Sequence, residues 1–349
     1  FINKRIKLIM AYTTINKSTE YFNTKLYTGT GSSNAQTGVG FQPDLLWIKK
    51  RNGAVNHLLH DAIRGVTKLL VPNTTGAEDT NTNILTSFDS DGFTVGTNSA
   101  SNNNGDTFAS WNWKANGQGS ANTDGSVSST VSANATAGFS IVQYNTNSSG
   151  TQTIGHGLGS APTFIITKPA LYSESWYVYS GALGVGSSVK LNTSDSSISS
   201  TPYAGTPTNS VFSINNGVIG GYTDVISYCF TDVQGYSKFQ KYIGTGSADG
   251  AFIYTGFKPA FVIIKRTDYE PFNWFVLDNK RNQANIVDKL LYVNENYAEG
   301  TNDFLDFTSN GFKLRTTNSG FNSSGATYIY MAFAEAPLVG TNNVPATAR

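Results

Sequence analysis

One long phrase occurs twice in the chain, and this repeat limits the possible folds more than any other feature. The stretch GFQPDLLWIKK occupies residues 40–50, and GFKPAFVIIKR occupies residues 256–266. The match continues on both sides at an offset of 215 to 221 residues, through a shared Asp-x-x-Arg, a Leu-Leu pair and a Gly-Phe pair. So many matches in the same order indicate that one module has been copied within the chain.

A third and more divergent copy lies between these two. Its phrase GHGLGSAPTFIITK places Pro162 six residues before Lys168, the spacing that also separates Pro43 from Lys49. The sequence therefore predicts three modules of ordinary domain size. We place an N-terminal segment at 1–20, the first module at 21–114, a linker rich in Gly, Ser, Asn and Thr at 115–137 that could hold one strand at Ser126–Val131, the degenerate second module at 138–235, the third at 236–337 and a C-terminal tail at 338–349.

Composition and pattern predict an all-β fold for each module. Charged residues make up 13% of the 349 residues, whereas an average soluble domain has about 25%. Gly, Ser, Thr and Asn are abundant, and these residues suit turns better than helices. The runs DLLWIK and FVIIK are typical of strands buried on both faces, while GFTVGT and GFKLRTT alternate apolar and polar residues. We therefore predict three tandem β-sandwich modules of jelly-roll-like type.

The last strand predicted in each module carries a recurrent apolar face. Alternate positions of this strand are apolar in all three copies, and most of them are large. They are Ala109, Trp111 and Trp113 in the first module, Ile226, Tyr228 and Phe230 in the second, and Ile329, Met331 and Phe333 in the third. We expect this face to form one wall of each core.

Charge and hydropathy argue against several kinds of partner. The formal net charge is +1 and no cluster of Lys or Arg stands out, so we predict no nucleic-acid partner. No apolar run approaches the roughly 18–20 residues that cross a bilayer, which predicts no membrane insertion. The single cysteine, Cys229, excludes an intrachain disulfide. Met10 opens MAYTTINKS, which resembles a natural start, so we expect residues 1–9 not to be native.

No motif for catalysis or metal binding stands out. His57, His60 and Asp61 lie close together, but the matching stretch of the third module has no histidine and nothing completes a metal site. His156 lies between glycines and fits a turn. The phrase DSDG at 89–92 lacks the distal ligands of a calcium loop. We predict no metal, no cofactor and no enzyme activity.

Two recurring features supply the candidate site residues. Asp61 with Arg64, and Asp278 with Arg281, stand at the same place in two modules, which favours structural charge pairs over ligand-binding groups. Seven aromatic residues lie beside polar residues in predicted loops or strand ends. There they would either stack on a sugar or pack in a core or subunit interface. They are Tyr172, Trp176, Tyr177, Tyr179, Tyr269, Phe272 and Trp274.

Longer phrases resemble those of a known family. MAYTTINKSTEYFNTKLYTG, DAIRGVTKLL, LTSFDSDGFTVG and GTGSADGAFIYTGFKPAFVIIKRTD are similar to phrases in a large family of uncharacterised repeat proteins encoded by marine bacteriophages. The similarity runs from about Met10 to about Pro337. It implies a virion structural protein, such as a tail-fibre, appendage or decoration subunit, and it implies no catalytic residues. The middle module departs most, because Ser180 stands where the acid would fall and no arginine follows.

The resemblance also implies a location and partners. We expect assembly in the host cytoplasm, a final place on the virion surface, and contacts with other virion proteins. We also expect a homo-oligomer, of which a trimer is one form, because symmetric assembly reuses one interface. The alternative hypothesis is a lectin-like adhesin that binds host surface glycans through the aromatic residues. A polysaccharide depolymerase is a weaker alternative.

Overall fold

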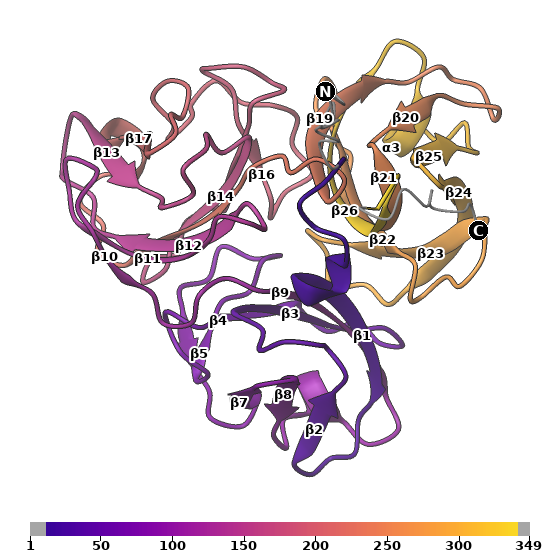
Figure 1. Ribbon diagram of the computed structural model, residues 1–349, viewed down its shortest axis with the longest axis horizontal. Coiled ribbons are helices and arrows are strands. Elements are labelled where there is room, and N and C mark those ends of the chain that lie inside the picture. Colours follow the sequence, from indigo (N-terminus) through magenta and orange to yellow (C-terminus); the bar gives the residue numbers. More distant parts are fainter. Residues whose placement is uncertain (1–11, 341–349) are drawn as a thin grey trace, which may run out of the picture.

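Three groups of antiparallel strands surround a common centre (Figure 1). The computed structural model describes residues 12–340. We call the groups module 1, with β1–β9, module 2, with β10–β18, and module 3, with β19–β26. The predicted all-β class is confirmed. The helical elements are η1 (Ser18–Glu20), α1 (Ser99–Asn102), α2 (Asn216–Ile219) and α3 (Ser319–Asn322). Within the described residues, none of the helices is long and apolar enough to cross a membrane.

Module 1 consists of two small sheets and a ribbon. One sheet has the strand order β1-β9-β3-β4 and the other has the order β2-β8-β7, while β5 and β6 pair with each other. The strand bounds are β1 (Phe22–Thr28), β2 (Asn34–Thr37), β3 (Leu45–Lys50), β4 (Leu58–Asp61), β5 (Lys68–Leu69), β6 (Asp79–Thr80), β7 (Leu85–Asp89), β8 (Gly92–Val95) and β9 (Thr107–Trp113). Strand β3 is buried on both faces, as its apolar run predicts.

Module 2 has a seven-stranded sheet, β10-β11-β12-β18-β14-β15-β16, and a two-stranded sheet, β13-β17. The bounds are β10 (Ser120–Asn122), β11 (Ser129–Asn134), β12 (Phe139–Tyr144), β13 (Thr151–Gly155), β14 (Phe164–Pro169), β15 (Tyr177–Ser180), β16 (Val189–Lys190), β17 (Val211–Asn215) and β18 (Val225–Phe230). The predicted linker 115–137 therefore contains two strands. The strand expected at Ser126–Val131 overlaps β11, and β10 is a second strand in this stretch. Ser, Thr and Val suit an edge strand, and Val131 becomes buried when β11 pairs with β12.

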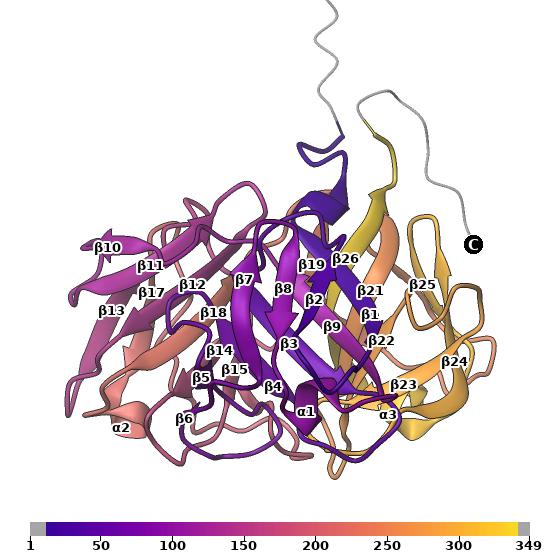
Figure 2. The same ribbon diagram turned by 90° about the horizontal axis from the view of Figure 1, so that it is seen from below.

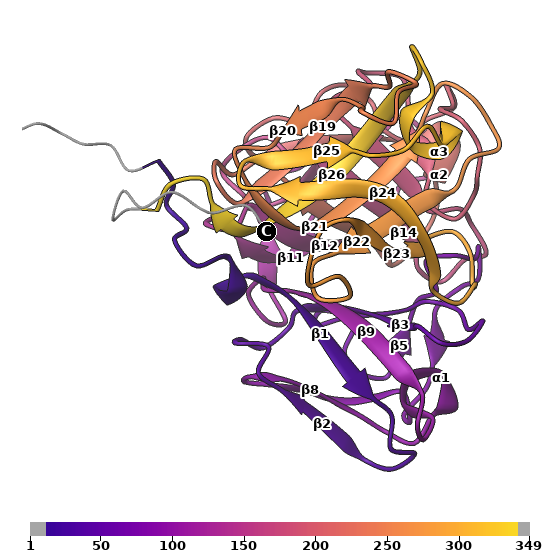
Figure 3. The same ribbon diagram turned by 90° about the vertical axis from the view of Figure 1, so that its right-hand side faces the viewer.

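Module 3 is one continuous sheet of eight strands in the order β19-β26-β21-β22-β23-β24-β25-β20 (Figure 3). The bounds are β19 (Ser237–Ile243), β20 (Phe252–Tyr254), β21 (Phe257–Arg266), β22 (Trp274–Asp278), β23 (Val287–Tyr292), β24 (Gly300–Thr308), β25 (Gly311–Leu314) and β26 (Thr327–Pro337). The sheet curls into a nearly closed barrel, so the prediction of two separate sheets is wrong for this module. Strand β23 joins the two halves of the sheet, because it pairs with both β22 and β24. In module 1 the short strand β5 pairs with β6, and the two sheets stay separate.

A single apolar cluster fills the centre where the modules meet. It contains the complete apolar face predicted for β9, β18 and β26. The ring of Trp113 lies 5.8 Å from the rings of both Phe261 and Phe333, and Phe230 lies 6.0 Å from Phe333. A void of about 10 Å³ remains between Trp47, the last strands and their neighbours, which is room for at most about one water molecule. The three predicted walls therefore pack against one another across the modules.

The molecule has two distinct ends (Figure 2). The short helices α1, α2 and α3 lie at one end, which we call the helical end. The first and last described residues lie at the opposite end, which we call the terminal end. There the hydroxyl of Tyr12 donates to the carbonyl of Gly256 at 2.7 Å, and the N–H of Leu338 donates to the same carbonyl at 3.3 Å.

Candidate functional site

The surfaces between the modules repeat one set of polar contacts. We name them the 1/3, 2/1 and 3/2 junctions, where the first number is the module that supplies a buried lysine and the second is the module that receives it. Equivalent residues follow from the strand pairing of β3, β14 and β21 with the last strands β9, β18 and β26. The chain thus closes on itself as a ring of three modules.

A buried lysine lies near the end of β3, β14 and β21. Lys49, Lys168 and Lys265 are fully buried, and each ammonium group donates to carbonyl oxygens. One of these carbonyls always belongs to the neighbouring module: Asn296 O lies 3.2 Å from Lys49 Nζ, Thr75 O lies 3.1 Å from Lys168 Nζ, and Ser194 O lies 3.1 Å from Lys265 Nζ. Burial lowers the pKa of each lysine to about 8. At neutral pH each therefore still carries its proton and donates.

Replacing any of these lysines with methionine should lower the free energy of unfolding by about 2–4 kcal/mol, because buried carbonyls lose their donor while the apolar stem is kept. Urea unfolding of Lys49→Met, Lys168→Met and Lys265→Met measures the loss. Lys241→Met, at an exposed side chain, is the control and should change stability by less than about 0.5 kcal/mol. A loss at one junction alone would show that the three lysines are not equivalent.

A ring N–H crosses each junction beside the lysine. The contacts are His57 Nε2 to Tyr292 O at 2.8 Å, Trp176 Nε1 to Val71 O at 3.2 Å, and Trp274 Nε1 to Lys190 O at 2.8 Å. His57 Nδ1 accepts a hydrogen bond from Trp47 Nε1 at 2.9 Å, so its own proton is on Nε2 and points across the junction. Two tryptophans and one histidine therefore make the same contact.

The backbone completes each junction two residues after the lysine. Glu299 N donates to Arg51 O at 2.7 Å, Glu78 N donates to Ala170 O at 2.6 Å, and Ser197 N donates to Thr267 O at 2.8 Å. Each acceptor extends the strand that carries the buried lysine. Lysine, ring and backbone contacts thus occur at all three junctions.

The two predicted charge pairs lie beside these contacts. Arg64 Nε is 2.7 Å from Asp61 Oδ2, Arg281 Nε is 2.6 Å from Asp278 Oδ2, and both pairs are buried. Each carboxylate also accepts a hydrogen bond from the last strand of another module. These donors are Tyr228 Oη, 2.7 Å from Asp61 Oδ2, and Trp111 Nε1, 3.1 Å from Asp278 Oδ2. Each pair therefore fixes the turn that follows β4 or β22 and links that turn to the last strand of the neighbouring module.

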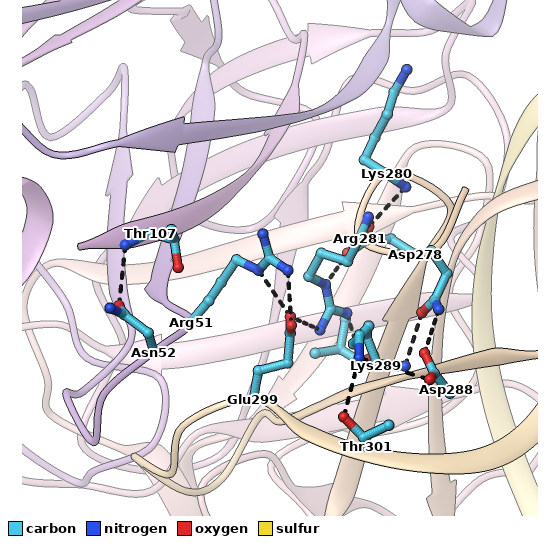
Figure 4. Close-up of polar contacts among 12 residues, drawn as sticks. Arg51, Asn52, Thr107, Asp278, Lys280, Arg281, Asp288, Lys289, Glu299 and Thr301 are labelled. Carbon is cyan, nitrogen blue, oxygen red and sulfur yellow. Dashed lines mark hydrogen bonds and ion pairs between the residues drawn. The ribbon is translucent and has the colours of Figure 1, made fainter. Parts of the chain in front are cut away.

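At the 1/3 junction the charge pair extends into a group of four charged side chains (Figure 4). Arg281 Nη1 lies 3.2 Å from Glu299 Oε2. Arg51 of module 1 binds the same carboxylate through two hydrogen bonds, from Nε at 3.0 Å and from Nη2 at 2.8 Å. With Asp278, two guanidinium groups face two carboxylates, so the buried charges compensate one another. These groups hold the modules together and leave no free charge for a ligand.

The 3/2 junction lacks the carboxylate link. Its equivalent positions hold Met331 on β26 and Ser180 on β15. The side chain of Met331 has no N–H or O–H to donate, and the buried hydroxyl of Ser180 makes no hydrogen bond within the described residues. A buried carboxylate without its cation and donor costs several kcal/mol. The 3/2 junction lacks the donor, the carboxylate and the arginine together, so no charge is left buried without a partner there.

The structure buries four of the seven candidate aromatic residues. Trp176, Tyr177, Tyr179 and Trp274 lie in the core or at a junction, where a sugar in solution cannot reach them. Tyr172 is half-buried and packs on Tyr222, with their ring centres 4.4 Å apart. Core and junction packing therefore accounts for most of this set.

Tyr269 and Phe272 form a solvent-facing cluster with Arg266. The Arg266 guanidinium carbon lies 5.3 Å from the ring centre of Tyr269 and 4.7 Å from that of Phe272, and 62% of Tyr269 is exposed. The neighbouring Glu270 accepts a hydrogen bond from Ser196 N at 3.0 Å, which fixes the loop against module 2. We call Arg266, Tyr269 and Phe272 the Tyr269 cluster.

The histidines take part in packing. His57 and His60 are fully buried, and His156 fixes a turn by accepting from Leu158 N at 3.2 Å and contacting Thr208 O at 3.1 Å. Between residues 12 and 340, no group of three or more His, Cys, Asp or Glu side chains could hold a metal ion.

Sequence reasoning missed the junction contacts, although part of their signal was visible. The shared spacing from proline marks the three lysines, but their acceptors are backbone carbonyls. Carbonyl acceptors have no residue signature, so the pattern could not reveal what the lysines bind.

Comparison with known proteins gives one match. A family model described as a domain of unknown function (DUF7483) matches residues 17–337, a range that runs through all three modules. No curated protein and no solved structure matches the chain.

Proposed function

Since the chain belongs to the DUF7483 family, whose function is unknown, we propose that it is a structural subunit of a bacteriophage particle, a fibre, appendage or decoration protein that serves assembly and surface display. The phage assignment comes from the resemblance of its long phrases to phage-encoded repeat proteins. The structural role is supported by the junctions.

The observation that carries the structural role is the threefold repetition of the junction contacts. Buried lysines, ring donors and backbone groups bind one module to the next, and the centre that they surround is apolar and almost without a void. These buried polar groups therefore bind the modules to one another. This favours a rigid building block, and we propose no catalytic role for it.

The arrangement of the two ends fits surface display. Attachment of the protein through the terminal end would turn the helical end, with its three short helices, away from the particle (Figure 2). We therefore propose the helical end as the displayed face on the virion surface.

We further propose other virion proteins and additional copies of the chain as partners. The module surfaces that a simple trimer would use between copies are occupied within one chain, so a homo-oligomer must use other surfaces. Light scattering of the purified protein measures its oligomeric state. The jelly-roll class stays our proposal for modules 1 and 2, which keep separate sheets.

Mass spectrometry of gradient-purified phage particles tests the proposed function. Peptides from residues 69–114 should be present at a fixed number of copies per particle and should resist a high-salt wash. If infected lysates contain the chain but purified particles lack it, the protein is not a virion subunit.

A second candidate, a glycan-binding adhesin, is favoured by the Tyr269 cluster alone. An exposed aromatic ring beside a guanidinium and carboxylates suits the face and hydroxyl groups of a sugar. Tyr269→Ala should reduce binding of the protein to host surface polysaccharide at least about tenfold, because a stacking ring is lost. Tyr297→Ala, at a tyrosine of module 3 that is 53% exposed, is the control. Absence of binding by the unaltered protein, or equal loss in both variants, would rule out this site.

A further inference from the structure

Strands β1, β12 and β19 occupy equivalent places, because each pairs with the last strand of its module, and module 2 shows what can cover the other edge of such a strand. Strand β12 pairs with β18 on one side and with β11 on the other. The residues around β11 also reach β13, through a parallel bridge between Val127 and Ile154 and a hydrogen bond from Ser129 Oγ to Gly155 O at 3.1 Å. Residues 125–134 therefore fill the seam between β12 and β13, antiparallel to the first strand and parallel to the second.

The equivalent seam of module 3 lies between β19 and β20, and no segment within residues 12–340 fills it. These strands are the two edges of the eight-stranded sheet, since β19 pairs with β26 and β20 with β25. A hollow of about 400 Å³ lies between them. The chain that joins modules 2 and 3 does not fill it, because the segment 231–236 turns directly into β19.

The part of β19 near the terminal end is already covered. Outward-facing N–H groups of Ser237 and Phe239 donate to Val233 O and to Asp232 Oδ1, both at 2.9 Å. Because alternate residues of an edge strand face outward, the next outward groups are those of Lys241 and Ile243. Within residues 12–340 no hydrogen bond engages these groups. In module 2 the position of Lys241 is held by Gln143, which pairs with Thr130 of β11.

Side chains along the seam also favour an extended partner. Three of the large apolar residues most exposed in the described chain gather there: Ile243 (52% exposed), Phe252 (46%) and Tyr254 (56%). The lining includes Lys238 and Lys241 and no carboxylate. A strand that entered the seam would cover apolar surface and could place an acidic residue opposite Lys241.

We propose that the β19–β20 seam is a binding site for an extended strand of a different protein, not of a second copy of this chain. That strand has small or β-branched residues at alternate positions and a carboxylate opposite Lys241, and it runs antiparallel to β19 as β11 does to β12. The proposal goes beyond the proposed function, since it holds whether or not the partner is a virion protein. The competing role for Lys241 is to protect a free edge from pairing.

Two labelled peptides test the site on the full chain. One is GSVSSTVSAN, which copies residues 125–134, and the other carries Thr130→Glu. Fluorescence anisotropy and the amide resonances of Lys241 and Ile243 report binding. The Glu peptide should bind about two- to fivefold tighter, which corresponds to one opposite-charge cross-strand pair. A scrambled peptide of the same composition should not shift these resonances.

Two variants separate backbone pairing from charge. Lys241→Pro removes an outward N–H without breaking the β26 ladder, so binding should be lost while the melting temperature stays within a few degrees of the original. Lys241→Ala should keep binding but lose the preference for the Glu peptide. The proposal is overturned if no saturable shift appears at millimolar peptide, or if Lys241→Pro binds normally. It is likewise overturned if the unaltered protein forms dimers that Lys241→Pro abolishes, because a second copy would then occupy the seam.

Discussion

Replacing Asp278 with alanine should lower the free energy of unfolding by about 3–5 kcal/mol and the melting temperature by about 4–7 °C. The Asp278 carboxylate accepts from Arg281 Nε at 2.6 Å and from Trp111 Nε1 of module 1 at 3.1 Å. Its removal leaves the buried indole N–H of Trp111 without an acceptor. It also leaves the buried guanidinium of Arg281 with only one carboxylate, that of Glu299, to compensate its charge. The variant therefore damages a turn of module 3 and its contact with module 1 together. Urea unfolding and thermal unfolding measure the effect.

Asp249→Ala is the matched control for this variant. Asp249 lies in the same module and also faces cations, Lys313 at 2.8 Å and Arg315 at 3.6 Å, but its side chain is 80% exposed. Exposed ion pairs contribute little, so its loss should leave the free energy of unfolding nearly unchanged. Equal stability of the Asp278 and Asp249 variants would show that the buried pair does not hold the 1/3 junction together.

Mild acid should destabilise the protein strongly, because two histidines are buried in the neutral form. Burial lowers the pKa of His57 and of His60 from the ordinary value of 6.5 to about 3. Between these two values the unfolded chain binds protons that the folded chain does not, so the free energy of unfolding falls as the pH falls from 6.5 toward 3. At pH 4.5 the loss relative to neutral pH is about 2–3 kcal/mol for each histidine, which the difference between urea unfolding at pH 7 and at pH 4.5 measures.

His57→Gln separates this effect from general acid denaturation. A glutamine can accept from Trp47 and donate to Tyr292 O without titrating, so this variant should lose about half of the histidine-dependent change between pH 7 and pH 4.5. The pH dependence of His156→Gln should resemble that of the original chain more closely, because burial lowers the pKa of His156 less than that of His57. An unaltered pH dependence in His57→Gln would mean that His57 is not the group that titrates on unfolding.

Strand positions and core faces were predictable because they depend on local alternation. The runs that became β3 and β21 are buried on both faces, and the phrases that became β8 and β25 alternate as expected. The nine apolar residues of the three last strands all enter the central cluster. Period-two patterns record which face is buried, so these features were visible in the sequence.

What the three walls pack against could not be predicted, because alternation does not identify the partner surface. Trp111 and Tyr228 looked like ordinary core residues, yet each also donates a hydrogen bond to an acid in another module. The recurrence of Asp-x-x-Arg indicated a structural pair but not its link to the last strand of a neighbour. The strand β10 and the exact bounds of β11 were obscured by small polar residues, which suit both linkers and edge strands.

Three modules closed around one core should unfold as one cooperative unit, and differential scanning calorimetry tests this most directly. With an unfolding enthalpy of about 0.7 kcal/mol per residue near 60 °C, the 349-residue chain should give a single transition of about 240 kcal/mol. The van't Hoff enthalpy, which is obtained from the width of the transition, should equal this calorimetric enthalpy. Two or more separate transitions would show that the modules unfold independently and that the junctions do not unite them. A van't Hoff enthalpy of only about 70 kcal/mol, the value expected for one module, would show the same.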